Sequence, residues 1–595
     1  MIKHFCERRL LLQNIGVLMP LVVAAVFLAD ASPVRSGAAL QPASESVQRA
    51  LSVTVVDETK RRRISGITVP HHIPALDLIA RGFMTAGRGE YERIIVLTPD
   101  HFRRSKTPFA TTDESFSTGL GPVNVDKKAV QSLVQSCPLV GRSRLFDQEH
   151  GLQILLPFLA AVFPGVKALP VALRVESTEE QWICLADALD PLFSEKTLIV
   201  QSTDFSHYLT HREARRHDQQ TLNALALSDP KAVLTLRQPQ HIDSKAAQYV
   251  HMELQRRRGN RGPVVIGNRN SGQHSPFVTS AGTTSYLVQV FEKAGAPDSA
   301  WPNYPDTETW IFAGDAFLGR SVARLLATKD GAAALSRNIL GLTGGHPMAL
   351  NLEGVLLPRM AQPRLRTELF MDERASVGFL SSINVRIAGL ANNHSLDAGC
   401  SGLENTPAIL QARGITPVRE GEVIDAGKFR LTALTDLCNK TSPLGSRITP
   451  SAIQQLALDP QLRFPAFAFV HWGKEFSDDV SSSQDRIATW LEDTAVSLIC
   501  GSHPHVASAG LERWKGSDGL VAWTLGNFLF DQPEGSGAFL EVRFFDNGTY
   551  ATRWLVIPNL LHRDAAVPEL KEELADRYSS RALWEPEIGV GTAGR

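Results

Sequence analysis

Short apolar runs that end abruptly in polar side chains recur along the whole chain, and they constrain its fold more than any other feature. Many of the apolar residues are β-branched, which is typical of strands buried on both faces of a sheet. Open α/β sheets place their ligand groups just beyond the carboxyl ends of such strands. We therefore expect α/β architecture in both halves of the chain, each with a site at one sheet edge. The runs and their polar ends are RIIVL–TPDH, TLIVQ–STDFSH, PVVIG–NRNSGQH, WIFA–GDAF, VRIAGL–ANNHS, FAFV–HWGKE and LIC–GSHPH.

Length and charge set the outer limits of this interpretation. The 595 residues allow about two to four domains at roughly 100–200 residues per domain. Hydrophobic residues make up 43% and charged residues 21%, which excludes a largely disordered chain. The 61 Lys and Arg residues balance 62 Asp and Glu residues to a net charge of −1. No overall basic field attracts nucleic acid, so we expect no nucleic-acid partner.

The amino-terminal segment has the pattern of an export signal. Lys3, Arg8 and Arg9 precede an uncharged, mainly apolar run over residues 15–29. That run is shorter than the roughly 20 residues that span a bilayer, but it has the length of a signal-peptide core. We expect export to the periplasm or cell envelope. The alternative is an uncleaved anchor, which would be the only part of the chain in contact with the membrane.

Composition also suggests where the chain divides. One small, polar segment follows the leader, and a proline-rich segment without apolar periodicity lies near the middle of the chain. The expected parts are a signal peptide or anchor (1–31), a linker (32–52), a first domain (53–293), a second linker (294–308), a second domain (309–560) and a charged tail (561–595).

The cysteines give no framework for the fold. The six residues are widely and irregularly spaced and form no CxxC pair, which excludes a zinc knuckle and a dense disulfide network. Leader removal would leave five. We expect most of them to be buried thiols. One disulfide is compatible with this spacing, and the sequence does not assign its pairing. They are Cys6, Cys137, Cys184, Cys400, Cys438 and Cys500.

The second half carries the stronger set of metal-binding residue types. Carboxylate, amide and imidazole groups follow successive strands in a consistent order, and these are the ligands that divalent metals use. A single aspartate after a strand is most often a helix N-cap, so the interpretation depends on the whole set. Two metals about 3.5–4 Å apart could activate a water and neutralise a phosphoryl group. The set is Gly314-Asp315, Asn351-Leu352-Glu353, Asn392-Asn393-His394, His471-Trp472-Gly473 and Gly501-Ser502-His503-Pro504-His505.

Residues 309–557 resemble a known family through the blocks GDAFLGR, LNLEG, ANNHSLDAG, GLENTPAILQARGI, VHWGKEF, GSHPHV and TLGNFLFDQ. The family is that of the bacterial CapA capsule synthesis proteins, implicated in poly-γ-glutamate capsule production. The resemblance implies a calcineurin-like metallophosphoesterase fold, an α/β/β/α sandwich with a metal centre. The metal ligands it implies are Asp315, Glu353 as a bridge, Asn393 through its amide oxygen, His471, His503 and His505.

The same resemblance suggests catalytic roles and one departure. Beside the metal ligand Asp315, it implies His394 as the acid over the leaving group. Arg320 could clamp a phosphate or carboxylate, or form only a surface ion pair. Asn527 could orient a ligand or satisfy its own turn. Metallophosphoesterases usually begin with Asp-x-His, but Phe317 stands in place of that histidine, which puts phosphoesterase chemistry in question.

The first half has a second set of possible ligands at its expected strand ends. Two histidines from different strands and a third donor are the minimum for an open metal site. The alternative is that these side chains only satisfy backbone groups in loops. The set comprises His71, His101, Glu149, His150, Asp204, His207, Ser271 and His274.

Most of residues 60–292 resembles the MEMO-like proteins, including protein B of the AmmeMemoRadiSam system, whose fold is similar to class III extradiol dioxygenases. The blocks are VPHHIPA, VLTPDHF, DQEHGLQILLPFL, STDFSHY and NSGQHSPFVTSAGTTSYLV. The resemblance implies that His71 and His101 line a metal site with the other residues of the set nearby. Animal members add a cysteine ligand near residues 270–274, where this chain offers Ser271 or His274, and Thr98 replaces the usual glycine. We therefore expect a metal- or ligand-binding pocket of unassigned reaction.

Three functions follow from these features. The leading one is an exported enzyme of capsule or extracellular polymer biosynthesis that uses Mn, Zn or Fe for hydrolysis or transfer in its second half. Its partners would be an envelope polymer or small-molecule substrate and other capsule-synthesis proteins. The second is a non-catalytic envelope assembly factor, which Phe317 favours. The third is a dioxygenase centred on His71 and His101.

Overall fold

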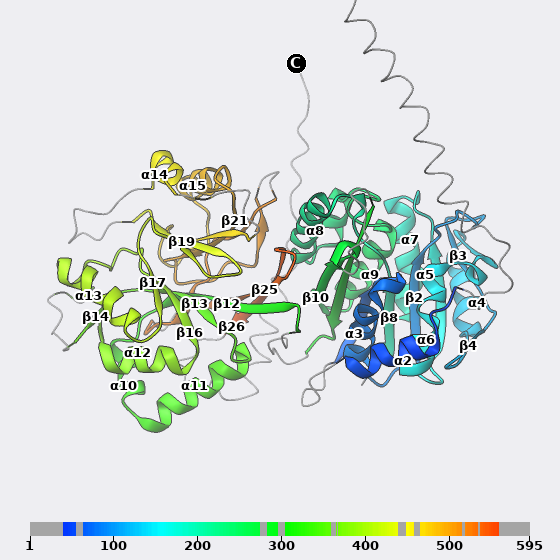
Figure 1. Cartoon of the computed structure of the whole chain (residues 1–595), viewed down its shortest axis with the longest axis horizontal. Helices are drawn as coiled ribbons and strands as arrows, with labels where there is room; N and C mark the ends of the chain where they lie inside the picture. Colours follow the sequence, from blue (N-terminus) through cyan, green and yellow to red (C-terminus); the bar gives the residue numbers. More distant parts are fainter. Residues whose placement is uncertain are drawn as a thin grey trace, which may run out of the picture.

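The computed structural model shows two α/β bodies that lie side by side (Figure 1). It describes residues 40–54, 63–87, 89–273, 282–295, 304–358, 365, 367–437, 448–456, 458, 464–514, 518–532 and 536–557. The expected signal peptide or anchor (1–31) and charged tail (561–595) lie outside the described residues. Within the described ranges, no helix combines the length and the apolar character needed to cross a membrane.

The first body is built on a nine-stranded sheet in the order β10-β11-β1-β8-β2-β7-β3-β6, with β9 paired to β11. Strands β1, β8, β2 and β7 are parallel neighbours, β11 pairs antiparallel to β1, and β10 pairs antiparallel to β11. The strands are β1 (Ile64–Val69), β2 (Arg93–Pro99), β3 (Phe109–Thr111), β6 (Val140–Arg142), β7 (Lys167–Leu173), β8 (Thr197–Ser202), β9 (His207–Leu209), β10 (Arg261–Asn270) and β11 (Thr283–Glu292); β4 (Phe116–Thr118) and β5 (Gly121–Val123) pair separately.

Helices cover both faces of this sheet. Gly82 of α3 lies against Val69, whereas Gly66 of β1 lies against His251 of α9, so α3 and α9 pack on opposite faces. An apolar core fills most of the space between the layers, and buried polar side chains, among them Gln201, Gln248 and His251, lie between the sheet and α9. The helices are α2 (Ser44–Val53), α3 (Leu76–Ala86), α4 (Lys127–Ser136), α5 (His150–Gln153), α6 (Leu156–Val162), α7 (Glu179–Leu189), α8 (His211–Ala226) and α9 (Lys245–Arg257).

Part of the expected linker 32–52 is instead a helix of the first body. Helix α2 buries Val47 and Ala50 against the core, and it packs on α3 and α6. The two residues are three apart, so they share one helix face. The polar composition of the segment concealed this spacing. At the second linker, Tyr304 is already buried and β12 starts at Thr307, before the expected domain start at 309.

The second body has four layers. One sheet has the order β17-β16-β13-β12-β25-β26 with β24 beside β12, and the other has the order β18-β19-β20-β21-β23-β22. An aromatic core that includes Phe312, Phe429 and Phe467 fills the space between the two sheets. Helices α10 to α13 pack outside the first sheet, and α14 and α15 pack outside the second (Figure 1). The predicted α/β/β/α sandwich is confirmed.

The strands of this body include each apolar run predicted in the second half. The strands are β12 (Thr307–Ala316), β13 (Met348–Leu352), β16 (Val385–Gly389), β17 (Thr416–Val418), β18 (Val423–Asp425), β19 (Arg430–Thr435), β20 (Ala466–His471), β21 (Val496–Ser502), β22 (Glu512–Arg513), β23 (Leu520–Ala522), β24 (Asn527–Leu529), β25 (Gly537–Phe545) and β26 (Tyr550–Ile557), with β14 (Val355–Leu357) and β15 (Phe370–Asp372) as a separate pair. The helices are α10 (Arg320–Leu326), α11 (Lys329–Thr343), α12 (Glu373–Ser382), α13 (Gly399–Gln411), α14 (Pro450–Gln454) and α15 (Ser482–Glu492).

The two bodies meet where the β25–β26 hairpin packs on α8 and β10 (Figure 1). Gln219 of α8 makes two hydrogen bonds with the backbone of Tyr550, at 3.0 and 3.1 Å. Asn268 of β10 donates to Thr549 Oγ1 at 2.8 Å. Phe545 belongs to the apolar core of the first body. The bodies therefore share packed and hydrogen-bonded surface in addition to the chain that connects them.

Buried charges lie at the same junction. Glu541 and Arg543 of β25 are each 2% exposed, and Arg553 of β26 binds Glu541 through Nε at 3.0 Å and Nη2 at 2.9 Å. Arg543 Nη2 lies 3.7 Å from Glu541, and Arg553 Nη1 lies 3.8 Å from Glu292 of the first body. We call these four residues the junction ion cluster. Burial lowers the pKa of Arg543 to about 10, and the neighbouring Glu541 carboxylate opposes this shift.

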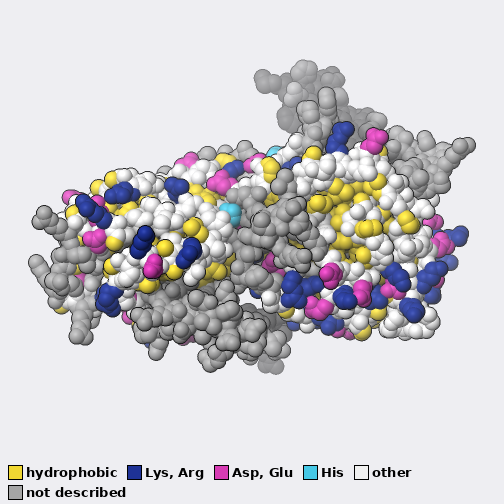
Figure 2. Space-filling model, turned by 90° about the horizontal axis from the view of Figure 1, so that it is seen from below, with side chains coloured by type: hydrophobic (Ala, Val, Ile, Leu, Met, Phe, Trp, Pro, Cys, Tyr) yellow, Lys and Arg dark blue, Asp and Glu magenta, His cyan; other side chains and the backbone are white. Residues whose placement is uncertain are grey.

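The surface seen from below mixes both signs of charge. Figure 2 shows hydrophobic side chains gathered over the first body on this face, with basic and acidic side chains interspersed along its edge. On the described part of this face, neither sign forms a continuous field. The arrangement agrees with the net charge of −1.

Burial of His251 predicts acid sensitivity of the first body. His251 lies in the core against Gln201 and Gln255, and burial lowers its pKa to about 3. The unfolded chain therefore binds this proton below about pH 6.5 while the folded chain does not, so stability falls with falling pH by up to about 1.4 kcal/mol per unit. Thermal unfolding between pH 7 and 4 should show a shallower decline in His251→Gln than in wild type. The exposed His211→Gln is the control, and parallel curves for His251→Gln and wild type would contradict the prediction.

Candidate metal centres

The second body brings its candidate ligands together because the carboxyl ends of two facing sheets converge. Strands β12, β13 and β16 are parallel neighbours in one sheet, and β20 and β21 are parallel neighbours in the other. Close approach of the chain is required here, since a Cβ at Gly314 would overlap the carbonyl oxygen of Gly526. The residues assembled at these ends are Asp315, Asn351, Glu353, Asn393, His394, His471, His503 and His505.

Asp315 is fully buried at the centre of this site. Its Oδ1 accepts a hydrogen bond from Asn351 Nδ2 at 2.7 Å, and its Oδ2 accepts one from the backbone N–H of His503 at 2.9 Å. Two imidazoles are nearby, because His505 Nδ1 lies 3.6 Å from Oδ2 and His471 Nδ1 lies 3.8 Å from Oδ1. The carboxylate is thus fixed in position by donors on both oxygens.

Glu353 supplies the observation that a cation fits this site. Its Oε2 and the Nδ1 of His503 are buried polar atoms without a hydrogen-bond partner. Burial and the neighbouring Asp315 raise the pKa of Glu353 well above its ordinary value, and burial also raises that of Asp315. Two close, buried carboxylates repel each other unless a cation neutralises them.

The histidines complete two overlapping ligand groups that share Glu353. Ligand atoms lie within 4.8 Å of one another in the group Glu353, His503 and His505, and also in the group Asp315, Glu353 and His471. Burial lowers the pKa of His503 to about 3 and that of His471 well below its usual value. Neutral imidazoles keep the lone pair that a metal requires.

The remaining polar side chains orient these groups. His471 Nε2 lies 2.8 Å from Asn393 Oδ1, and its Nδ1 lies 2.9 Å from Ser502 Oγ. Asn527 Oδ1 lies 2.8 Å from His505 Nδ1, so Asn527 positions a candidate ligand.

His394 stands at the edge of the same site, 3.7 Å from Glu353 through Nε2. Its Nδ1 lies 2.8 Å from Asp397, which belongs to the same ANNHSLDAG block. A carboxylate on one ring nitrogen fixes the direction of the other toward the site. The arrangement suits a proton donor held over a bound group.

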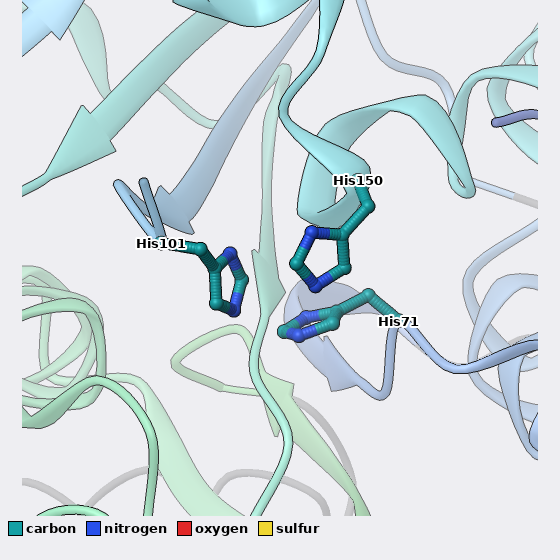
Figure 3. A group of neighbouring side chains, drawn as sticks. All are labelled: His71, His101 and His150. Carbon is teal, nitrogen blue, oxygen red and sulfur yellow. The ribbon is translucent and has the colours of Figure 1, made fainter. Parts of the chain in front are cut away.

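The pocket of the first body also lies at the carboxyl ends of neighbouring parallel strands. Strands β1, β8 and β2 are neighbouring parallel strands, and His71, Asp204 and His101 each lie two residues beyond the end of one of them. His150 begins the short helix α5 above these ends. Figure 3 shows the three imidazoles turned toward one another. The ring centres of His101 and His150 are 4.0 Å apart, those of His71 and His101 are 4.8 Å apart, and ligand nitrogens of all three lie within 4.8 Å.

Sequence reasoning missed the carboxylate at the centre of this pocket, Asp243. Its Oδ2 lies 3.3 Å from His71 Nε2 and 3.6 Å from His101 Nε2, and it accepts a hydrogen bond from the Asp204 backbone at 3.0 Å. Its Oδ1 is buried without a partner. Asp243 follows no strand and stands just before α9, so the strand-end pattern could not find it.

His101 carries the positive charge that faces the carboxylates of the first pocket. Burial opposes its protonation, but hydrogen bonds to Asp243 and Glu149 outweigh burial and raise the His101 pKa to about 10. Burial and the positive His101 lower the His150 pKa to about 4, and burial lowers the His71 pKa well below its usual value. A cation would have to compete with the proton on His101 for the same carboxylates.

Comparison with known proteins agrees with this division. A family described as Memo-like protein matches residues 32–287, and a family described as bacterial capsule synthesis protein PGA_cap matches residues 309–427 and 460–532. The first half resembles the Memo-like family and the second half resembles PGA_cap, and we refer to them as the Memo-like half and the PGA_cap-like half. Both predicted resemblances are confirmed.

Individual relatives cover one half each. The PGA biosynthesis protein CapA of Bacillus subtilis is 24% identical over 313 residues, which span 47% of this chain and 80% of that protein. A MEMO1 family protein of Thermotoga petrophila is 28% identical over 183 residues, which span 29% of this chain and 65% of that protein. A solved structure described as a novel phosphatase from Mycoplasma pneumoniae aligns at 16% identity with a TM-score of 0.28, covering 42% of this chain and 93% of that one.

Two further residues singled out in the sequence of the PGA_cap-like half, Phe317 and Arg320, lie outside the group of candidate metal ligands. Phe317 is 1% exposed and packs on Phe530 in the apolar core, so its position offers no ligand. Arg320 lies 3.4 Å from Asp531, and its side chain is 40% exposed. Of the two alternatives for Arg320, the ion pair is therefore present.

Of the remaining predicted residues of the Memo-like half, Glu149 and His207 lie close to the three histidines, whereas Ser271 forms a local backbone contact. Glu149 binds His101 Nδ1 at 2.6 Å, and His207 lies close enough to lower the His71 pKa. Ser271 lies in a short 3-10 helix, where its Oγ accepts a hydrogen bond from the Thr284 backbone at 3.0 Å. His274 lies outside the described residues.

Proposed function

We propose that this protein is an exported, metal-dependent hydrolase or transferase of capsule or extracellular polymer biosynthesis. Its reaction would take place in the PGA_cap-like half. The observation that carries the proposal is the pair of buried carboxylates, Asp315 and Glu353, with Glu353 Oε2 and His503 Nδ1 left without partners. The names of the CapA relatives, which refer to capsule and PGA biosynthesis, support the process.

The residues of the site suit attack on a phosphoryl or acyl centre. Asp315, Glu353, Asn393, His471, His503 and His505 would hold a divalent metal, Mn, Zn or Fe. A bound metal would supply an activated water and stabilise developing negative charge. His394, held by Asp397, would donate a proton to the leaving group.

Substrate, partners and location are parts of the same proposal. We infer an envelope polymer or a small molecule as substrate, and other capsule-synthesis proteins as partners. The amino-terminal charge and apolar pattern supports export to the envelope. The Memo-like half would provide a second metal or ligand pocket through His71, His101, His150 and Asp243.

Metal analysis of matched variants tests this function. We expect full-length wild type loaded with Mn²⁺ to retain metal in both halves and to hydrolyse bis(p-nitrophenyl) phosphate. His503→Ala should lose the metal of the second half and at least about 100-fold in rate, because it removes a ligand. His71→Ala should lose only the metal of the first half, and the exposed His211→Ala should lose neither. A folded wild type that retains no Mn²⁺, Zn²⁺ or Fe²⁺ would overturn the proposal.

A non-catalytic assembly factor is the second candidate, because Phe317 fills the position of the usual histidine with buried apolar packing. Polymer production in cells distinguishes the two. The variant Glu353→Ala with His471→Ala should abolish production if the site is catalytic. Normal production by this variant, at wild-type protein levels, would favour the assembly factor.

A further inference from the structure

Two cysteines far apart in the sequence lie side by side in the Memo-like half. Cys137 follows the last residue of α4, and Cys184 lies within α7. The two Sγ atoms are 3.2 Å apart, and the helices pack against each other. Cys137 is fully buried and Cys184 is partly exposed, so solvent reaches the pair only through Cys184.

We propose that Cys137 and Cys184 form a disulfide bond in the exported protein. A disulfide has an S–S length of about 2.05 Å, so the sulfurs have to approach by only about 1 Å. Rotation of the partly exposed Cys184 side chain can supply much of this movement. All four described cysteines are free thiols in the structure, and of the other two, Cys400 is exposed on α13 and Cys500 is buried in β21 of the other half.

The chemistry proceeds by exchange with an oxidised dithiol donor, the class of oxidant that serves exported proteins. The Cys184 thiolate attacks one sulfur of the donor disulfide, which forms a mixed disulfide and releases one donor thiolate. The Cys137 thiolate then attacks Cys184 Sγ and releases the second donor sulfur. Two cysteine thiols are oxidised, one donor disulfide is reduced, and both protons leave with the donor dithiol.

The accessibility of the two sulfurs gives this order of attack. Burial and the adjacent Cys184 raise the pKa of Cys137 to about 11, which keeps it protonated and slow as a first nucleophile. Cys184 is the sulfur that a bulky donor can reach. The bond would tie α4 to α7 across 47 positions of sequence, and closing a loop of that length restricts the unfolded chain.

The proposal depends on the export component of the proposed function, because cytosolic thiols remain reduced. It is independent of the metal site, so the two can fail separately. The full-length protein is isolated from the envelope fraction with alkylation of free thiols, then digested without reduction. We expect the peptides of Cys137 and Cys184 to be joined, and those of Cys400 and Cys500 to be alkylated after denaturation.

Stability measurements add a readout on the purified protein. Reduction should lower the melting temperature of wild type and of Cys400→Ser by about 5–10 °C. It should leave that of Cys184→Ser unchanged, since this variant has no bond to break. Recovery of Cys137 and Cys184 as separately alkylated peptides from the envelope protein overturns the proposal. Retained Mn²⁺ in that same sample would show that the metal site stands without the disulfide.

Discussion

Replacing Glu353 by glutamine is expected to weaken Mn²⁺ binding in the PGA_cap-like half by about 100-fold or more. The same change should stabilise the metal-free protein at pH 8. Burial and Asp315 raise the pKa of Glu353, so the folded protein holds this proton more tightly than the unfolded chain does. The free energy of unfolding of the metal-free protein therefore falls as pH rises above the ordinary pKa of a glutamate. A neutral glutamine at this position removes that loss of stability, which is about 1 kcal/mol or more.

The opposite signs of these two effects make the experiment specific. Isothermal titration with Mn²⁺ measures affinity, and thermal unfolding with and without chelator measures stability. Glu404→Gln, an exposed change on α13, is the matched control and should alter neither quantity. Loss of stability in chelator for Glu353→Gln, together with unchanged Mn²⁺ affinity, would mean that Glu353 has a structural role instead.

Replacing Glu541 by glutamine should destabilise the protein by about 3–5 kcal/mol, since it removes one carboxylate from the junction ion cluster. Glu541 lies 2.9 Å from Arg553 Nη2 and 3.7 Å from Arg543 Nη2, and all three side chains are at most 10% exposed. Arg553 would keep the ion pair with Glu292 at 3.8 Å, whereas Arg543 would lose the carboxylate of Glu541 beside it. Uncompensated buried charge is costly, and burial already lowers the Arg543 pKa.

Urea unfolding monitored by circular dichroism checks this value. Asp546→Asn provides the control, because Asp546 forms an ion pair with Lys428 at 2.9 Å but is 50% exposed. Exposed pairs contribute only about 0–1 kcal/mol, so the control should stay close to wild type. Equal losses of unfolding free energy in Glu541→Gln and Asp546→Asn would show that burial of Glu541 adds nothing to the stability that an exposed ion pair provides.

The four-layer sandwich followed from the resemblance to the CapA proteins, but the pattern of strands and their polar ends predicted α/β architecture in both halves and a candidate site at a sheet edge of each. It worked because β1, β8 and β2, and likewise β12, β13 and β16, are parallel neighbours whose carboxyl ends meet. Each predicted apolar run became a buried strand. Such runs are a strong local signal, since nearly every residue in them avoids water.

The misses have a common physical cause. Asp243 reaches the first pocket from the start of α9, and its role depends on where that helix packs and not on its own neighbours in sequence. Helix α2 buries only Val47 and Ala50, too few residues to stand out in a polar segment. The pairing of Cys137 with Cys184 depends on the contact between α4 and α7, which spacing in the sequence does not encode.

The position of β26 at the junction has a consequence for how the chain is synthesised and divided. Tyr550 and Arg553 lie in the last described strand, yet they complete contacts with Gln219 and Glu292 of the first half. A growing chain must therefore leave the surface of α8 and β10 uncovered until β25 and β26, residues 537–557, have emerged. For the same reason, either half expressed alone would present Phe545 or its apolar partners to solvent. Polar replacements on that surface would be needed before the two metal pockets could be studied apart.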